Sequence, residues 1–366
     1  MGYARFATQI EWTLINASVC VKISTNMNIP VNLHSQSSNY QGADDKAMKV
    51  IVTSSARLHM GFFDLNGTKG RMYGSLGVGI NAPCTQLEIT RGEKSIIEMA
   101  SGYQVSENIE KIVKSLKIAH KITQDFSVKI NQSIPGHTGL GSGTQMALAL
   151  GAGLNRLFNL GLTVPQIAAL TQRGSRSGIG IGTFAHGGFV VDGGRGNANA
   201  PPPIIAQHDF PSEWPILLIM DNAEQGAHGE HELKAFDALP IASLETAQNL
   251  AHRVLMQALP ALVERDYAEF SRAIYKLQRA TGEYFAPAQG GIFKSKNVAE
   301  VLNYLYQNNV LCAGQSSWGP TGFAVFKDDL SANARLTLLQ QQFSKYNNIS
   351  FQLVRSINTG ASIQLG

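Results

Sequence analysis

The feature that most constrains this chain is a glycine-rich segment between a strand pattern and a buried-helix pattern. The segment covers Ile134–Thr144 and reads Ile-Pro-Gly-His-Thr-Gly-Leu-Gly-Ser-Gly-Thr. Apolar residues alternate over Phe126–Gln132, which predicts a strand, and Thr144–Leu157 is apolar almost all round, which predicts a buried helix. Glycines free the backbone N–H groups to point at one spot, beside the positive end of the helix. The sequence therefore predicts a cradle for an anion.

Backbone and hydroxyl groups of this loop are predicted to bind phosphate oxygens. The residues assigned to this role are Pro135, Gly139, Leu140, Gly141, Ser142, Gly143 and Thr144. The loop is not a Walker loop, because no Lys follows its last glycine, and its spacing differs from the dinucleotide fingerprint. The alternative is a flexible turn whose glycines serve packing only. The strand, the hydroxyl groups and the buried helix together favour the anion cradle.

The distribution of charge around the loop agrees with an anion pocket. No Asp or Glu occurs from Phe126 through Val191, whereas Lys129, Arg156, Arg173 and Arg176 do. One interpretation is a buried segment that excludes all charge. The other is a pocket that excludes carboxylates because they would repel its ligand, and the glycine loop favours it. The net charge of +4 is too small to indicate nucleic acid.

Cysteine usage and hydropathy indicate a cytoplasmic protein. Cys20, Cys84 and Cys312 are odd in number and far apart, which is typical of reduced thiols and of neither a disulfide framework nor a zinc site. No apolar run approaches about 18 residues, so no membrane span is predicted. The first residues lack the charged start and long apolar core of a signal peptide.

Pattern and length predict an α+β chain in three parts. Residues 1–47 end in a polar, loop-like run and are predicted to be an extension outside the catalytic core. The length of 366 residues favours two domains, and strands and helices are mixed without strict alternation. A Gly/Asn/Pro-rich connector ends at residue 203, so we expect the domains at 48–203 and 204–366.

Three segments, in order, resemble the motifs of the GHMP (galacto-, homoserine, mevalonate and phosphomevalonate) kinase superfamily. They are Ser54–Gly61 after the opening strand, Pro135 with Gly139–Ser142, and Gly314–Phe323 before a later strand. The resemblance implies a ribosomal-protein-S-five-like N-terminal domain and a ferredoxin-like C-terminal domain, with the site between them. It further implies that the phosphate site is closed from the second domain by Ser316, Ser317 and Gly319.

One position departs from kinases of the mevalonate and galactose type. Those kinases place an Asp a few residues before a Gly-Gly pair, where it orients or deprotonates the attacking hydroxyl. The segment Arg176–Gly188 has Gly180 at that position, and Gly143 replaces the second serine of the kinase phosphate loop. A small-molecule kinase using ATP, such as homoserine kinase, is therefore a second hypothesis. A non-catalytic metabolite-binding protein of this fold is the third.

Further stretches resemble beta-ribofuranosylaminobenzene 5'-phosphate synthases, namely Arg57–Asn66, Tyr73–Ile80 and Gly178–Gly194. This resemblance implies a pentosyltransferase that condenses 4-aminobenzoate with phosphoribosyl pyrophosphate, releasing carbon dioxide and pyrophosphate, in methanopterin biosynthesis. Pyrophosphate departure leaves an oxocarbenium-like centre, so the main task is to stabilise the leaving group, with Mg²⁺ as the expected cofactor. No hydroxyl has to be deprotonated, which makes Gly180 intelligible.

Four basic residues are the candidate catalytic groups. Arg57 and His59 share one face of the first strand and are assigned to phosphate or to the aminobenzoate carboxylate; the alternative is a solvated strand end. Arg176 is three residues from Arg173, and both can converge on one anion or satisfy carbonyls at a helix end. His186 is assigned to substrate hydrogen bonding or proton donation, with a core histidine as the alternative.

Two acidic residues are the candidate metal ligands. Asp64 and Asp192 are candidate magnesium ligands, or else a turn and a strand-end carboxylate. His228 and Glu232 lie in a His/Glu-rich stretch whose spacing matches no structural zinc site; a polar helix entrance is favoured there, and both are kept as substrate contacts. The expected partners are the two small-molecule substrates, without nucleic acid or membrane, and a homodimer is an open alternative.

Overall fold

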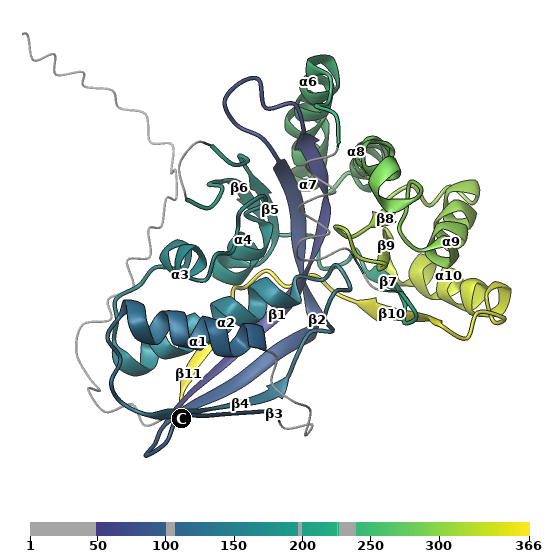
Figure 1. The fold of residues 1–366 in the computed structure, drawn as a ribbon. Helices are drawn as coiled ribbons and strands as arrows, with labels where there is room; N and C mark the ends of the chain where they lie inside the picture. The colour runs from purple at the N-terminus through teal and green to yellow at the C-terminus, as the bar shows by residue number, and fades with distance from the viewer. Residues whose placement is uncertain (1–48, 100–106, 197–199, 225, 227–238) are drawn as a thin grey trace, which may run out of the picture. The chain divides into compact units, whose positions relative to one another are not determined.

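The computed structural model describes residues 49–99, 107–196, 200–224, 226 and 239–366 (Figure 1). The predictions for residues 1–47, His228 and Glu232 lie outside these residues. Asp45–Gly366 form one compact unit.

A seven-stranded sheet, in the order β11-β1-β2-β4-β3 with β5 and β6 branching from β2, carries the glycine loop. Its strands are β1 (Lys49–Asp64), β2 (Gly74–Arg91), β3 (Ile96–Met99), β4 (Phe126–Gln132), β5 (Phe189–Asp192), β6 (Ile204–His208) and β11 (Ser362–Leu365). The predicted strand over Phe126–Gln132 is thus present as β4. Irregular pairing between β1 and β2 occurs at Ser55/Arg57 and again at His59/Gly61. Such bulges re-aim side chains, here where two site candidates lie.

Four helices follow the strands of this sheet: α1 (Glu107–Ala119), α2 (Ser142–Phe158), α3 (Val164–Leu170) and α4 (Ile179–His186). α1 and α2 cover one face of the sheet (Figure 1), and α2 and α4 contact both β1 and β2. The predicted buried helix is α2. A Cβ at its Gly153 would lie 2.6 Å from Ile89 Cδ1, so the glycine lets the helix approach the sheet without displacing that side chain.

The second sheet is antiparallel, in the order β10-β7-β9-β8. Its strands are β7 (Ile216–Asp221), β8 (Ala313–Gln315), β9 (Gly322–Val325) and β10 (Ile349–Val354). The accompanying helices are α6 (Leu244–Arg253), the π-helical turn η1 (Val254–Ala258), α7 (Leu259–Glu264), α8 (Tyr267–Gln289), α9 (Lys296–Gln307) and α10 (Asp329–Gln342). The mixture of helix and sheet confirms the predicted α+β class. Strand β6 begins at Ile204 yet pairs with β5, and the division of domains at residue 203 stays a prediction.

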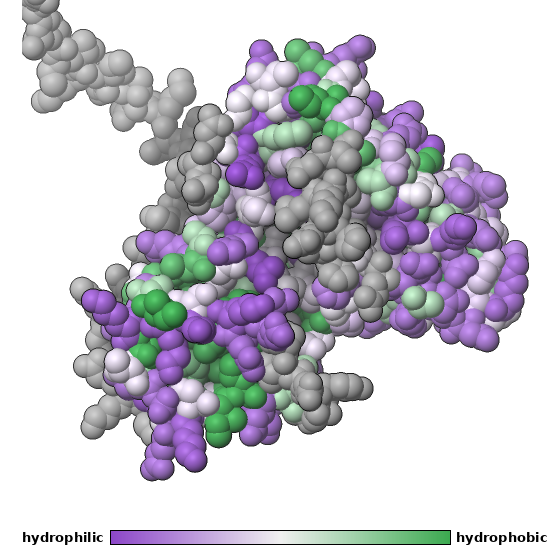
Figure 2. Space-filling model, in the orientation of Figure 1, coloured by the Kyte–Doolittle hydropathy of each residue, from purple (hydrophilic) through white to green (hydrophobic). Residues whose placement is uncertain are grey.

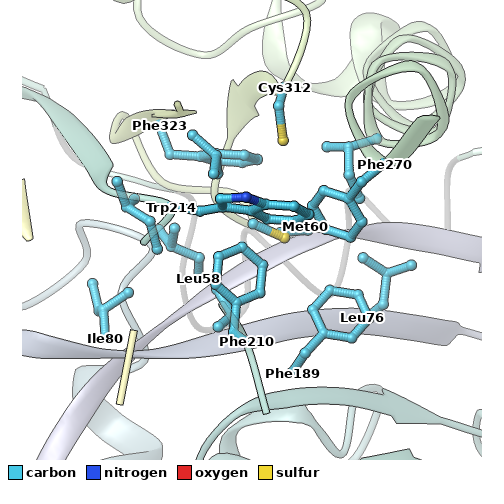
Figure 3. Close-up of a cluster of buried hydrophobic side chains, with 14 of the residues drawn as sticks. Leu58, Met60, Leu76, Ile80, Phe189, Phe210, Trp214, Phe270, Cys312 and Phe323 are labelled. Carbon is cyan, nitrogen blue, oxygen red and sulfur yellow. The ribbon is translucent and has the colours of Figure 1, made fainter. Parts of the chain in front are cut away.

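One buried cluster joins the two sheets. Leu58 and Met60 from β1 lie among Trp214 and Phe323 from the second half of the chain (Figure 3). The rings of Phe210 and Trp214 are 5.6 Å apart and nearly perpendicular, the edge-to-face geometry that aromatic pairs favour. Because both halves of the chain contribute to this core, it fixes the positions of the loops that connect the two sheets.

On the face drawn in Figure 2, hydrophilic residues predominate among those described, with smaller groups of hydrophobic residues between them. Of the helices in the described ranges, none has both the length and the hydropathy to cross a membrane.

Candidate active site

The N-terminus of α2 is open to an anion. Gly141 precedes the helix with a φ of 87°, offers no side-chain cap, and no acidic residue lies in the first turn. The N–H groups of Thr144 and Gln145 both donate to the Gly141 carbonyl, at 3.1 and 3.0 Å. The N–H groups of Ser142 and Gly143 precede any intrahelical acceptor. These two groups and the helix dipole form the predicted cradle.

Two guanidinium groups lie beside this N-terminus. A Cβ at Gly141 would lie 3.2 Å from Arg57 Nε, and a Cβ at Gly143 would lie 3.5 Å from Arg173 Nη1. Arg57 also holds the loop. Its side-chain Nη1 donates to the Gly139 carbonyl, and its backbone N–H donates to the Leu140 carbonyl at 3.1 Å. The structure therefore brings Arg57 and Arg173 to the glycine loop.

Arg173 carries a donor that the described protein does not use. Burial lowers the pKa of its guanidinium, and its Nε is buried without a hydrogen-bond partner among the described residues. Burying a charged donor without a partner costs free energy. A ligand anion next to Gly143 would recover that cost.

The loop Ser316–Gly319 packs closely against the glycine loop. Ser316 Oγ donates to the Gly139 carbonyl at 2.8 Å and accepts from the backbone N–H of His59 at 3.0 Å. A Cβ at Gly139 would lie 2.2 Å from the Ser316 carbonyl oxygen, and one at Gly319 would lie 2.1 Å from the Thr138 carbonyl oxygen. The Ser317 N–H donates to the His59 carbonyl at 3.3 Å. Ser316 and Gly319 thus meet the glycine loop, whereas Ser317 meets β1. The binding of phosphate by these three residues stays a prediction.

His59 is a neutral residue in this structure. It is 3% exposed, and desolvation together with the charge of Arg57 lowers its pKa to about 3. The Gly61 N–H donates to its Nδ1 at 3.3 Å, so the proton of the neutral ring is on Nε2. That atom is buried without a partner among the described residues. His59 therefore supplies no positive charge at neutral pH, and its binding of phosphate or of the aromatic carboxylate stays a prediction.

α4 presents its first turn, not its last, to the glycine loop. A Cβ at Gly180 would lie 2.9 Å from Thr144 Cγ2, and Gln145 Nε2 donates to the Gly180 carbonyl at 2.9 Å. The kinase carboxylate position is thus occupied by a tight contact with the loop. His186 is exposed at the opposite end of α4, so no described contact brings it to the loop. Arg176 is half-buried in the turn before α4.

The two candidate magnesium ligands serve the protein backbone. Asp192 is fully buried; its Oδ2 accepts from Ser75 Oγ, from Ser177 Oγ at 3.2 Å and from the Gly178 N–H at 2.8 Å. Its Oδ1 accepts from the Gly194 N–H at 2.9 Å. Burial raises the pKa of Asp192 to about 6. These bonds hold the turn at the start of α4 against β5.

Asp64 ends β1, and its Oδ1 accepts from the N–H groups of Asn66 and Gly67 at 2.9 and 3.1 Å. Within the described ranges, no group of three or more His, Cys, Asp or Glu residues could hold a metal ion. The assignment of Asp64 and Asp192 as magnesium ligands, and Mg²⁺ itself, stay predictions.

Two contacts of the site escaped sequence reasoning. The buried Ser54 Oγ donates to Gln145 Oε1, which fixes the first turn of α2 to β1. The Gly226 N–H donates to the His137 carbonyl at 2.7 Å. Ser54 is the first residue of the first superfamily motif, and this position is a signal that could have predicted its place in the site. Gly226 stands in no recognisable pattern.

Family models match both halves of the chain. The GHMP kinases N-terminal domain matches residues 107–188, and the GHMP kinases C-terminal domain matches residues 258–345. Among solved structures, a homoserine kinase from Cytophaga hutchinsonii aligns with a TM-score of 0.65 at 15% identity, covering 89% of this chain and 100% of its own. A mevalonate diphosphate decarboxylase from Staphylococcus aureus aligns with a TM-score of 0.63 at 15% identity, covering 87% and 98%. These likenesses show the fold.

Sequence relatives define the family more narrowly. The beta-ribofuranosylphenol 5'-phosphate synthase of Methanocaldococcus jannaschii is 32% identical over 300 residues, covering 75% of this chain and 89% of the relative. The synthase of the same name from Archaeoglobus fulgidus is 32% identical over 288 residues, covering 74% and 85%. A 4-diphosphocytidyl-2-C-methyl-D-erythritol kinase from Geobacillus sp. matches a shorter part, 37% identical over 217 residues and 59% of this chain. The chain belongs to the beta-ribofuranosylphenol 5'-phosphate synthase family, on the GHMP kinase fold.

Proposed function

We propose that this protein is a pentosyltransferase that joins C1 of phosphoribosyl pyrophosphate to the ring of a 4-substituted benzoate. The observation that carries the proposal is the N-terminus of α2, flanked by Arg57 and Arg173 and without an acidic residue in its first turn. Such a site stabilises negative charge that develops on a leaving group. Membership of the synthase family supports the same reaction.

The reaction needs no general base at the position of Gly180. The C1–O bond of the donor breaks with its electron pair moving to pyrophosphate, and the ring carbon that bears the carboxylate attacks the oxocarbenium-like C1. The bond from that carbon to the carboxylate then breaks, carbon dioxide leaves, and its electron pair restores the aromatic ring. No proton is taken from an attacking group, so the close contact of Gly180 with Thr144 is compatible with catalysis.

The aromatic acceptor follows from the product. The related enzymes are named for a ribofuranosylphenol, and replacing the carboxylate of 4-hydroxybenzoate by ribose gives a phenol. The same replacement in 4-aminobenzoate gives an aminobenzene. We therefore propose 4-hydroxybenzoate as the acceptor, with the 4-aminobenzoate predicted from sequence as the alternative. Either group donates electrons to the ring carbon opposite it.

In this proposal, Mg²⁺ binds together with the phosphates of the substrate. In proteins Mg²⁺ is commonly held by substrate phosphates with one or two carboxylates and several waters. Such binding does not require a cluster of ligands built by the protein.

The test is a decarboxylation assay. The protein is incubated with phosphoribosyl pyrophosphate, Mg²⁺ and carboxyl-labelled 4-hydroxybenzoate or 4-aminobenzoate, and labelled carbon dioxide is followed. Release that depends on the pyrophosphate donor supports the synthase, and the faster acceptor identifies the substrate. ATP consumption with homoserine is measured in parallel. If neither acid releases labelled carbon dioxide and ATP is consumed with homoserine, the kinase hypothesis replaces the synthase hypothesis.

A further inference from the structure

A cavity of about 240 Å³ adjoins Arg173. It is lined by Ala169, Gln172, Arg173, Gly174, Ser175, Arg195, Ala200 and Pro201. Among the described residues, the lining contains two guanidinium groups, a hydroxyl and an amide, and no carboxylate. Its donors and charge therefore suit an anion with several oxygens, since a phosphate monoester can accept from each of these groups.

Arg195 is fixed by its backbone while its side chain is available. Its N–H donates to the Met72 carbonyl at 2.6 Å, and the Met72 N–H donates to the Arg195 carbonyl at 3.0 Å. The preceding Gly194 has a φ of 68°, and its N–H is held by Asp192 Oδ1 at 2.9 Å. The Arg195 side chain is exposed and makes no hydrogen bond or ion pair with the described residues. It is thus presented at the rim of the cavity without a hydrogen-bond partner among the described residues.

Arg173 connects the cavity with the glycine loop. Its side chain lines the cavity and also stands 3.5 Å from the Cβ position of Gly143, in the first turn of α2. Its Nε is buried without a partner among the described residues. One guanidinium is therefore in reach of two anion positions. This arrangement suits a substrate with two separate phosphate groups.

We propose that this cavity binds the 5-phosphate of the phosphoribosyl donor through Arg173 and Arg195, while the N-terminus of α2 takes the pyrophosphate. The inference rests on the proposed function, because that function supplies a donor with phosphates at both ends. The cavity has room for a phosphate group together with part of the pentose. A planar carboxylate of the aromatic acid would occupy two acceptor positions and leave the remaining donors of the cavity unused.

The test is binding to the full-length protein by titration calorimetry, with ribose 5-phosphate, inorganic pyrophosphate and 4-hydroxybenzoate as separate probes. Arg195→Gln is the variant, because an exposed side chain can be replaced without disturbing the core. Arg335→Gln, which removes the same charge from α10, is the control. Loss of a charge-assisted hydrogen bond predicts that Arg195→Gln weakens ribose 5-phosphate at least about tenfold. Its affinity for pyrophosphate is expected to change by less than about twofold, because no hydrogen bond or ion pair among the described residues joins the Arg195 side chain to α2.

Unchanged ribose 5-phosphate affinity in Arg195→Gln overturns the inference. Weakened 4-hydroxybenzoate with unchanged ribose 5-phosphate overturns it as well, and assigns the cavity to the aromatic carboxylate. The proposed function is judged separately by carbon dioxide release. If ribose 5-phosphate binding depends on Arg195 but the protein releases no carbon dioxide, the subsite is supported and the proposed reaction is excluded.

Discussion

Ser316 Oγ donates a 2.8 Å hydrogen bond to the carbonyl oxygen of Gly139, across 177 positions of sequence. The same hydroxyl accepts from the His59 N–H at 3.0 Å. One fully buried side chain therefore connects the glycine loop, β1 and the loop from the second sheet. The shape of the anion cradle depends on a residue that lies far from it in sequence.

Replacing this hydroxyl is expected to loosen the cradle. Ser316→Ala leaves the Gly139 carbonyl and the His59 N–H without this partner, which predicts a loss of about 1–3 kcal/mol in the free energy of unfolding. The KM for phosphoribosyl pyrophosphate is expected to rise. Chemical denaturation and steady-state kinetics measure the two effects. Ser115→Ala is the control, because that exposed hydroxyl donates only to the Lys111 carbonyl within α1. Equal behaviour of both variants would remove Ser316 from the site.

Restoring the kinase carboxylate is expected to repel the substrate. In Gly180→Asp a negative charge would stand beside Thr144, whose Cγ2 lies 2.9 Å from the Cβ position, at the end of α2 that receives pyrophosphate. Like charges that meet in a binding site cost several kcal/mol.

Gly180→Ala is the matched control, because it introduces the same Cβ contact without the charge. We expect pyrophosphate to bind Gly180→Asp at least about tenfold more weakly than Gly180→Ala, measured by calorimetry at low ionic strength. Equal affinities would place the anion elsewhere.

The parts of the fold that depend on local pattern were predictable. Alternation over Phe126–Gln132 gave β4 its bounds, and the apolar run after Thr144 predicted α2, which extends from Ser142 to Phe158. Motif order also predicted that Ser316 and Gly319 meet the glycine loop. Periodicity reports which residues share a face of one element, so these predictions needed no knowledge of other elements.

The environment of His59 could not be predicted in this way. Alternation in β1 placed it on the same face as Arg57, and the pairing with β2 is regular from Arg57 to His59, with irregularities before and after these two residues. α8 then packs on β1, with Gln278 Nε2 donating to the Met60 carbonyl at 2.7 Å. The His59 ring centroid lies 4.6 Å from that of Phe62, and the Ser316–Gly319 loop is hydrogen-bonded to the His59 backbone. The surroundings of the imidazole therefore include a segment that is distant in sequence. The fully bonded state of Asp192 has the same origin, because three of its donors come from the β2 and α4 segments.

The burial of His59 predicts a pH dependence of stability. Its folded pKa of about 3 lies below the ordinary histidine pKa of 6.5, so below pH 6.5 the unfolded chain binds a proton that the folded protein does not. Stability from this residue is present above pH 6.5 and is lost as the pH falls toward 3, by up to about 1.4 kcal/mol per pH unit. Urea unfolding of the wild type and His59→Gln between pH 4 and pH 7 measures the difference. His252→Gln, at an exposed position on α6, should retain the wild-type slope.

Asp192 predicts a slope of the opposite sign in the same range. Its folded pKa is raised from 3.8 to about 6, so between these values the folded protein binds a proton that the unfolded chain has released. The contribution of this group to stability is therefore full below pH 3.8 and falls as the pH rises through 6.

Asp192→Asn removes this titration and also one carboxylate oxygen, which leaves fewer acceptors for Ser75, Gly178 and Gly194. We expect the wild type to lose stability relative to Asp192→Asn as the pH rises from 4 to 6, measured by urea unfolding at each pH. Binding of ribose 5-phosphate is expected to weaken in the variant at every pH, because the Gly194 N–H that precedes Arg195 is no longer held by a carboxylate. A stability difference that does not change across this range would mean that Asp192 is already ionised at pH 4. Its four hydrogen bonds would then outweigh the desolvation of the carboxylate.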